Sequence, residues 1–175
     1  MNYSWIKYND TANGPGVRIS LFVSGCRNHC EGCFNKDTWD FNHGQLYTPD
    51  VLDEILKNAA LPRYSGITIL GGEPFEPENQ PEVLHTVKAF KELYPDKTVW
   101  LFSGYLYDKN LAPGGNRYIE NITDEILSRA DVLCDGRFVK ELYDISLLFR
   151  GSSNQRLIDL KKSTRDNIVL YSSSL

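Results

Sequence analysis

The sequence predicts an α/β fold with a mainly parallel sheet, and three observations lead to this class. Short apolar runs that read as strands alternate with stretches of helical periodicity. Several of these runs stop at a glycine or polar motif, as strands do where a sheet meets a ligand. The 175 residues contain no internal repeat, low-complexity tract or linker. We therefore expect one domain over residues 1–175, long enough to bury a substantial core.

The first half of the chain supplies a strand, a helix and a second strand. An apolar run from Arg18 to Val23 reads as a buried strand. Thr48 is expected to cap a helix that has Pro49 at its first position. The apolar run from Ile67 to Leu70 predicts the next strand. The helix between them has one apolar face, made of Val51, Leu52, Ile55, Leu56 and Ala59.

The second half continues the alternation. A helix is expected from about Gln80 to Tyr94, followed by a strand from Thr98 to Phe102. The irregular stretch from Tyr105 to Ile122 suits a lid, a docking loop or a disordered segment. After it, the sequence predicts a short helix capped by Thr123 and ending near Arg129, and strands at 132–134, 158–160 and 168–171.

Composition narrows the setting. The formal net charge is −4, and acidic and basic residues are interleaved, so a nucleic-acid footprint is not expected. The first ten residues lack the apolar core of a signal peptide, and no apolar stretch approaches the length of a membrane span. We expect a soluble, cytoplasmic protein. In that setting a tight cluster of cysteines indicates metal binding or catalysis more than disulfides.

Cys26, Cys30 and Cys33 form such a cluster, with the spacing C-x3-C-x2-C directly after the first predicted strand. Three ligands are one short of a closed tetrahedral zinc site. A cubane iron–sulfur cluster takes four thiolates, so three would leave one iron with an open coordination position. An open iron can bind a small molecule and pass it an electron. The spacing therefore favours chemistry over a structural role.

Zinc is the alternative interpretation of the three cysteines, with His29 or Cys134 as the fourth ligand. Zinc sites of this kind usually combine two paired half-sites, and the sequence has only one. We expect His29 to be a loop residue and Cys134 to be a small buried apolar residue at the end of its strand.

Polar or glycine motifs also follow the other predicted strands. They are Ser24-Gly25, Gly71-Gly72-Glu73-Pro74, Ser103-Gly104 and Asp135-Gly136. Because ligands bind at the carboxyl ends of the strands in such folds, these motifs predict one site for an extended ligand. A carboxylate at Glu73 suits a cationic amine, so a ligand that carries an amino acid is expected.

The order of these motifs resembles the radical S-adenosylmethionine superfamily. Within it, the chain is most similar to the enzymes that activate anaerobic ribonucleoside-triphosphate reductase. The similarity covers nearly the whole chain and is carried by Asn13-Gly14-Pro15-Gly16, Leu21 to Cys26, Cys30 to Trp39, Gly71 to Pro74, Trp100 to Tyr105, Asp135 to Val139 and Arg150 to Arg156.

The resemblance implies a set of cofactors and residues that bind them. Cys26, Cys30 and Cys33 would hold one 4Fe–4S cluster, and the fourth iron would bind the amino and carboxylate groups of S-adenosylmethionine. No catalytic side chain is implied beyond these ligands. The cofactor contacts implied are backbone contacts of Gly71, Gly72, Glu73 and Pro74 to the methionine part, Gly32, Cys33 and Phe34 near the adenine, and Ser103 and Asp135 at the ribose, the carboxylate or a cation. Many members carry an aromatic residue where this chain has Gly32, so the role of Phe34 stays open.

The resemblance also implies a fold and an activity. The fold would be a partial, mainly parallel (β/α) barrel, shorter than a full eight-stranded one. Reductive cleavage of S-adenosylmethionine would give a 5′-deoxyadenosyl radical, which makes a glycyl radical on the C-terminal glycine loop of the reductase. A small electron donor such as flavodoxin is implied. The alternatives are an activase of another glycyl-radical enzyme, such as pyruvate formate-lyase, and a non-enzymatic zinc or iron–sulfur module.

Overall fold

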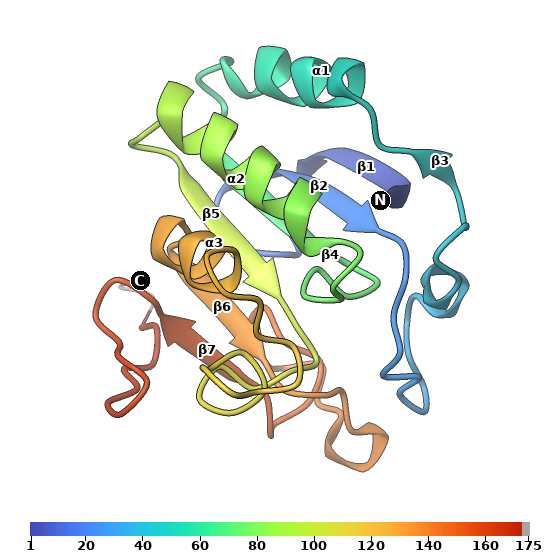
Figure 1. The fold of residues 1–175 in the computed structure, drawn as a ribbon, viewed down its shortest axis with the longest axis vertical. Helices are drawn as coiled ribbons and strands as arrows, with labels where there is room; N and C mark the ends of the chain where they lie inside the picture. Colours follow the sequence, from blue (N-terminus) through green and yellow to red (C-terminus); the bar gives the residue numbers. More distant parts are fainter. Residues whose placement is uncertain (173–175) are drawn as a thin grey trace.

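The computed structural model describes residues 1–172, which form a seven-stranded sheet and three α-helices (Figure 1). The strands are β1 (Asn2–Asp10), β2 (Val17–Val23), β3 (Gln45–Leu46), β4 (Tyr64–Gly71), β5 (Thr98–Phe102), β6 (Val132–Asp135) and β7 (Arg156–Asp159). The helices are α1 (Pro49–Ala59), α2 (Gln80–Leu93) and α3 (Thr123–Arg129), with single 3-10 turns η1 (Lys36–Trp39) and η2 (Lys140–Leu142). No helix in this part of the chain has the length and apolar character needed to cross a membrane.

The strand order is β3-β1-β2-β4-β5-β6-β7. The central strands β2, β4, β5 and β6 pair in parallel, while β1 and β3 on one side and β7 on the other pair antiparallel. The α/β class is confirmed, but the sheet is mixed, and the prediction of a mainly parallel sheet holds only for its centre. The edges differ because β1 reaches β2, and β6 reaches β7, through loops without a crossover helix.

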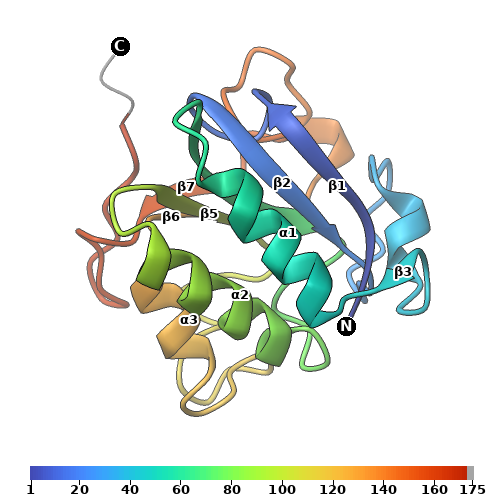
Figure 2. The same ribbon diagram turned by 90° about the horizontal axis from the view of Figure 1, so that it is seen from above.

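The two faces of the sheet are covered differently. All three helices lie on one face (Figure 2). Side chains that alternate along the central strands, among them Leu21, Ile69 and Leu101, are fully buried in the core on that side. The opposite face carries Trp100 and Cys134, which pack with loop residues into a second, smaller core. Much of this second face is covered by loops, and a cavity lies there.

Two strands at one side of the sheet were not predicted, β1 and β3. Tyr3, Ile6 and Tyr8 of β1 all pack against the helix-side core, although their spacing in the sequence is not strictly alternate. The pairing of β1 with β2 shifts register between Tyr3 and Trp5 and again between Lys7 and Asp10. Such bulges break the strict alternation by which a strand is recognised in a sequence. β3 has only two residues, too few to give a pattern.

Most of the other predicted elements are confirmed, with two corrections. Residues 168–171 do not form a strand, because only an isolated bridge joins Leu170 to Ile158. Thr123 does not cap α3. It is the first helical residue, and its hydroxyl accepts a hydrogen bond from the Ile119 N–H and donates one to Gln80 Oε1. This tertiary contact replaces the capping bond.

The long stretch 105–122 is a series of packed turns. Tyr105, Tyr107 and Leu111 are buried in the helix-side core, so the segment is part of the fold. Arg165 holds it from the far end of the chain by donating to the carbonyl oxygens of Tyr107 and Leu111. The segment does not line the cavity, which argues against the lid interpretation.

Candidate functional site

A cavity of about 450 Å³ lies where β2, β4, β5 and β6 end. Its wall combines the cysteine loop, the turn after β4, the turn after β5 and the loop from Gly136 to Gln155. It therefore sits at the carboxyl ends of the parallel strands, where the sequence placed it. The predicted residues that line it are Cys26, Cys30, Cys33, Phe34, Gly71, Gly72, Glu73 and Ser103. Gly32, Pro74 and Asp135 are not among the lining residues.

The cysteine loop is held by backbone contacts with the turn η1. Gly25 donates to the Thr38 carbonyl over 2.8 Å, and Cys26 donates to the Trp39 carbonyl over 3.2 Å. Backbone N–H groups also point at sulfur: Asn35 donates to Cys33 Sγ over 3.4 Å, and the amides of Asn28 and His29 donate to Cys26. The bonds to Cys26 favour its thiolate form, which a metal requires.

The donor set fits an iron–sulfur cluster. All four cysteines of the chain are free, and the three from the loop face one cavity. Burial raises the pKa of the Cys26 thiol to about 12, so the thiolate there needs the charge of a bound metal. Among the described residues no three His, Cys, Asp or Glu side chains meet closely enough to enclose one metal ion. The fit therefore rests on the shared cavity and on sulfur chemistry.

The turn after β4 packs directly against the cysteine loop. The Gly72 N–H donates to the Val23 carbonyl over 2.7 Å, and the Glu73 N–H donates to the Gly25 carbonyl over 2.9 Å. A Cβ at Gly72 would lie 2.7 Å from the Gly25 oxygen and 2.9 Å from the Val23 oxygen. Glycine is required here because the two backbones touch.

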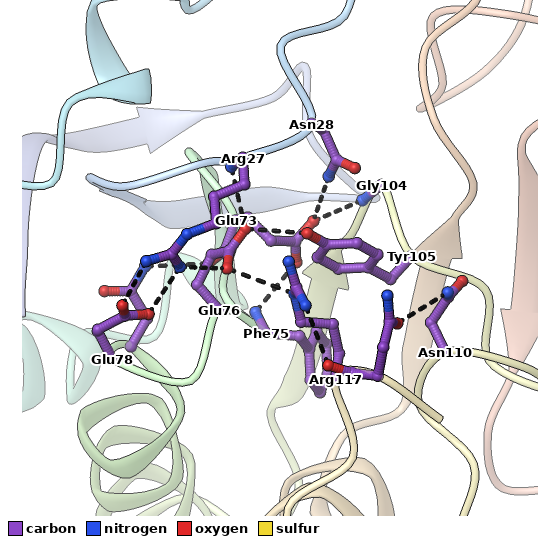
Figure 3. A network of polar contacts seen from close by, with 12 residues as sticks. Arg27, Asn28, Glu73, Phe75, Glu76, Glu78, Gly104, Tyr105, Asn110 and Arg117 are labelled. Atoms are coloured by element: carbon purple, nitrogen blue, oxygen red, sulfur yellow. Dashed lines mark hydrogen bonds and ion pairs between the residues drawn. The ribbon is translucent and has the colours of Figure 1, made fainter. Parts of the chain in front are cut away.

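The Glu73 carboxylate joins three segments of the cavity wall (Figure 3). Its Oε1 accepts from the Phe75 N–H and the Ser103 hydroxyl, and its Oε2 accepts from Asn28 Nδ2 and the Gly104 N–H, over 2.7 to 3.2 Å. Glu73 is 1% exposed. Burial raises the pKa of its carboxyl to about 7, although the donors favour the ionised form. With four donors bound, the carboxylate is used to position backbone, and the expected pairing with a ligand amine has no free acceptor.

A second buried carboxylate, Glu76, lies beside Glu73 and was not predicted from the sequence (Figure 3). It accepts from the Arg27 N–H and the Tyr105 hydroxyl, each over 2.9 Å, and pairs with Arg27 Nη1 over 2.7 Å. Arg117 Nε lies 3.3 Å away. The network ties the cysteine loop to the stretch 105–122. The only sequence signal was a run of acidic and amide residues after a predicted strand.

Asp135 and the segment from Arg150 to Arg156 brace the loop after β6. Asp135 is fully buried and accepts two bonds from Arg156, over 2.9 and 2.5 Å, and one from the Tyr107 N–H. The Gln155 amide spans the Gly136 carbonyl and the Gly151 and Ser152 N–H groups. Asp135 is therefore engaged away from the cavity.

Phe34 lies at the mouth of the cavity, 70% exposed. Its ring contacts Phe138 at 5.3 Å and Tyr143 at 5.9 Å between centroids. His29 is a loop residue that stacks on Trp39 at 4.6 Å, and Cys134 is fully buried in the second core. Both expectations for these residues are confirmed.

Comparison with known proteins gives one consistent answer. Residues 12–158 match the family model described as a 4Fe–4S single cluster domain. The anaerobic ribonucleoside-triphosphate reductase-activating protein of Escherichia coli K12 is 39% identical over 157 residues, which cover 89% of this chain and 96% of that protein. Proteins of the same name from phage T4 and Vibrio cholerae are 38% and 39% identical, over 90% and 89% of this chain and 93% and 96% of their own lengths.

Proposed function

This chain belongs to the family of anaerobic ribonucleoside-triphosphate reductase-activating proteins, and we propose that it is the enzyme that activates such a reductase. The observation that carries the proposal is the cavity where three cysteines of one loop meet the Gly-Gly-Glu-Pro turn. The chain belongs to a single-cluster iron–sulfur family, and its cavity would hold both a cluster and a small molecule.

We propose that Cys26, Cys30 and Cys33 hold one 4Fe–4S cluster. When bound, the cluster would supply the electron that cleaves S-adenosylmethionine to the radical that oxidises a glycine of the reductase. The chain contributes orientation and shielding. The amides that face Cys26 favour its thiolate, and the Asn35 N–H donates to Cys33 Sγ. The apolar side chains Phe22, Leu70 and Phe102 line the cavity.

We propose that the residues predicted from the sequence serve S-adenosylmethionine in two ways. Some contact it directly, and the carboxylates of Glu73 and Asp135 hold the cavity wall in place. Gly71, Gly72, Glu73 and Pro74 would receive the methionine part through backbone, while the Glu73 carboxylate holds that backbone in place. Gly32, Cys33 and Phe34 would lie near the adenine, and Ser103 near the ribose, the methionine carboxylate or a cation. Asp135, which is engaged by Arg156, would act by fixing the wall.

The partner is proposed to enter over Phe34 and the exposed apolar side chains of the loop from Gly136 to Gln155, a loop of which several other residues line the cavity. We call this set the apolar rim: Phe34, Leu142, Tyr143, Ile145 and Leu148, which are 43 to 87% exposed. Since the glycine of the reductase must reach the cavity, its C-terminal glycine loop would cover this rim. We further propose a small electron donor such as flavodoxin and a cytoplasmic location. The chain would form a single domain over residues 1–175, with a partial barrel built on the four parallel strands.

Anaerobic reconstitution with iron and sulfide tests the proposal. Reduced protein supplied with S-adenosylmethionine should release 5′-deoxyadenosine, and with the reductase present it should give the EPR doublet of a glycyl radical. Cys30→Ala should lose iron and cleavage, and Cys134→Ala, the matched control, should keep both. Cleavage without a doublet would send the activity to another glycyl-radical enzyme, such as pyruvate formate-lyase. Zinc in place of iron would end the enzyme proposal.

A further inference from the structure

Arg150 is the one positively charged side chain among the residues that line the cavity. The other charged lining residue is Glu73, whose carboxylate is already bound by four protein donors. Among the described residues no carboxylate pairs with Arg150. The cavity therefore contains a positive charge without a protein counter-ion.

The guanidinium of Arg150 is only partly used. Its Nη1 donates to the Gln155 carbonyl over 3.0 Å, while its Nε is buried with no hydrogen-bond partner in the described part of the chain. An unpaired buried donor on a charged group is costly, so native structures rarely keep one without a ligand or water. With Nη1 occupied, the edge that carries Nε and Nη2 remains. That edge forms the parallel pair of bonds by which arginine grips a carboxylate.

The other long polar side chains of the segment from Arg150 to Arg156 have protein partners, unlike Arg150 Nε. Arg156 forms ion pairs with Asp135 and Asp108. The side chains of Asn154 and Gln155 donate hydrogen bonds to backbone carbonyl groups of the loop after β6. Each of these polar side chains has a structural partner. These side chains therefore have structural roles, and Arg150 is the exception.

A second unpaired donor belongs to a residue that lines the same cavity. Trp39 Nε1 is buried without a partner among the described residues. Two donors without acceptors indicate a ligand rich in oxygen acceptors. Arg150 also borders a neighbouring cavity of about 370 Å³, but its bonded partner Gln155 lines only the first.

We propose that Arg150 binds a ligand carboxylate in this cavity. The inference rests on the proposed function, which supplies two sources of that group. One is the methionine carboxylate of S-adenosylmethionine, and the other is an acidic side chain of the reductase segment that enters the cavity. Arg150 is a binding residue in either case.

The test compares two ligands on the cluster-loaded protein under anaerobic conditions. Equilibrium dialysis measures Kd for S-adenosylmethionine and for its decarboxylated analogue, with wild type, Arg150→Gln and Arg150→Lys. Arg129→Gln, on the exposed end of α3, is the control because its partner is Glu125. A lost charge-assisted pair corresponds to a roughly 10- to 150-fold weaker Kd. Arg150→Gln should show this loss for S-adenosylmethionine and little for the analogue, and Arg150→Lys should recover part of it.

The outcomes separate the sources and the proposals. If Arg150→Gln keeps the affinity for S-adenosylmethionine but binds the reductase at least tenfold more weakly, the carboxylate comes from the partner. Equal losses for both ligands, or no loss for either ligand or the reductase, overturn the carboxylate site. Iron content and melting temperature equal to wild type show that the variants are folded. Wild-type protein that binds neither ligand nor reductase would overturn the proposed function itself.

Discussion

Replacing Gly72 by alanine tests how closely the turn after β4 packs on the cysteine loop. The added Cβ would lie 2.7, 2.9 and 3.0 Å from the carbonyl oxygens of Gly25, Val23 and Thr38. All three are backbone atoms, so no side chain can rotate away. The turn must therefore move from the cysteine loop, which strains two short hydrogen bonds, from Gly72 to Val23 and from Glu73 to Gly25.

The expected cost follows from these two effects. Overpacking costs about 1–3 kcal/mol, and two weakened hydrogen bonds add about 1 kcal/mol each. A loss of about 3–5 kcal/mol corresponds to a melting temperature lower by roughly 6–20 °C for a chain of this size. Circular dichroism of the metal-free protein under anaerobic conditions measures the melting temperature, and iron per chain after reconstitution should fall as well.

Gly104→Ala is the matched control. Its Cβ would meet Asn28 Nδ2, but this atom is the end of a side chain that can rotate and would lose one bond, to Glu73. We expect a loss of about 1 kcal/mol, hence a few degrees. If Gly72→Ala melted within a degree or two of wild type and loaded iron normally, the described packing of the two loops would be refuted.

Three further predictions concern charge and surface. The pKa of Glu73 is raised from 4.5 to about 7, so the folded chain binds the Glu73 proton more tightly than the unfolded chain does. The stability gained from this proton is complete below about pH 4.5 and is lost as the pH rises through 7. The free energy of unfolding in urea should therefore fall with pH over this range in wild type and not in Glu73→Gln. Arg156→Leu leaves Asp135 buried without its ion pair and should cost about 2–4 kcal/mol in urea unfolding, less than for a fully buried pair because Arg156 is 30% exposed; an unchanged free energy of unfolding would contradict the bracing role. Leu148→Asp in the apolar rim should reduce the glycyl-radical yield on the reductase and spare S-adenosylmethionine cleavage, while Leu93→Asp, equally exposed on α2, should change neither; equal yields would remove the rim from the docking surface.

The centre of the fold could be predicted because strands buried on both faces read as continuous apolar runs. Arg18 to Val23 and Thr98 to Phe102 are such runs, and they became β2 and β5. The edges could not be predicted so well. The bulges of β1 break its alternation, and β7 is placed by pairing with β6 more than by its own four residues.

The residues of the site also differ in how far the sequence predicts their roles. The cysteines, the Gly-Gly-Glu turn and Ser103 were predicted to meet because the ends of parallel strands share an edge, and they line one cavity. Asp135 follows the same rule in sequence, yet it lies opposite Arg156 in the antiparallel pairing of β6 with β7. That neighbour is 21 residues away, and only the register of the sheet reveals it.

The polar groups of the site fall into two kinds, and the difference carries functional meaning. Glu73, Glu76 and Asp135 are buried carboxylates that already accept hydrogen bonds from several parts of the chain, so they fix the loops that they join. Trp39 Nε1 and Arg150 Nε are buried donors without an acceptor among the described residues, and both belong to side chains that line the cavity. Since a satisfied group gains nothing from a ligand and an unsatisfied one gains a hydrogen bond, binding specificity should reside in the second kind. Substitutions of the carboxylates should therefore act first on stability and loop position, and substitutions of Arg150 first on affinity.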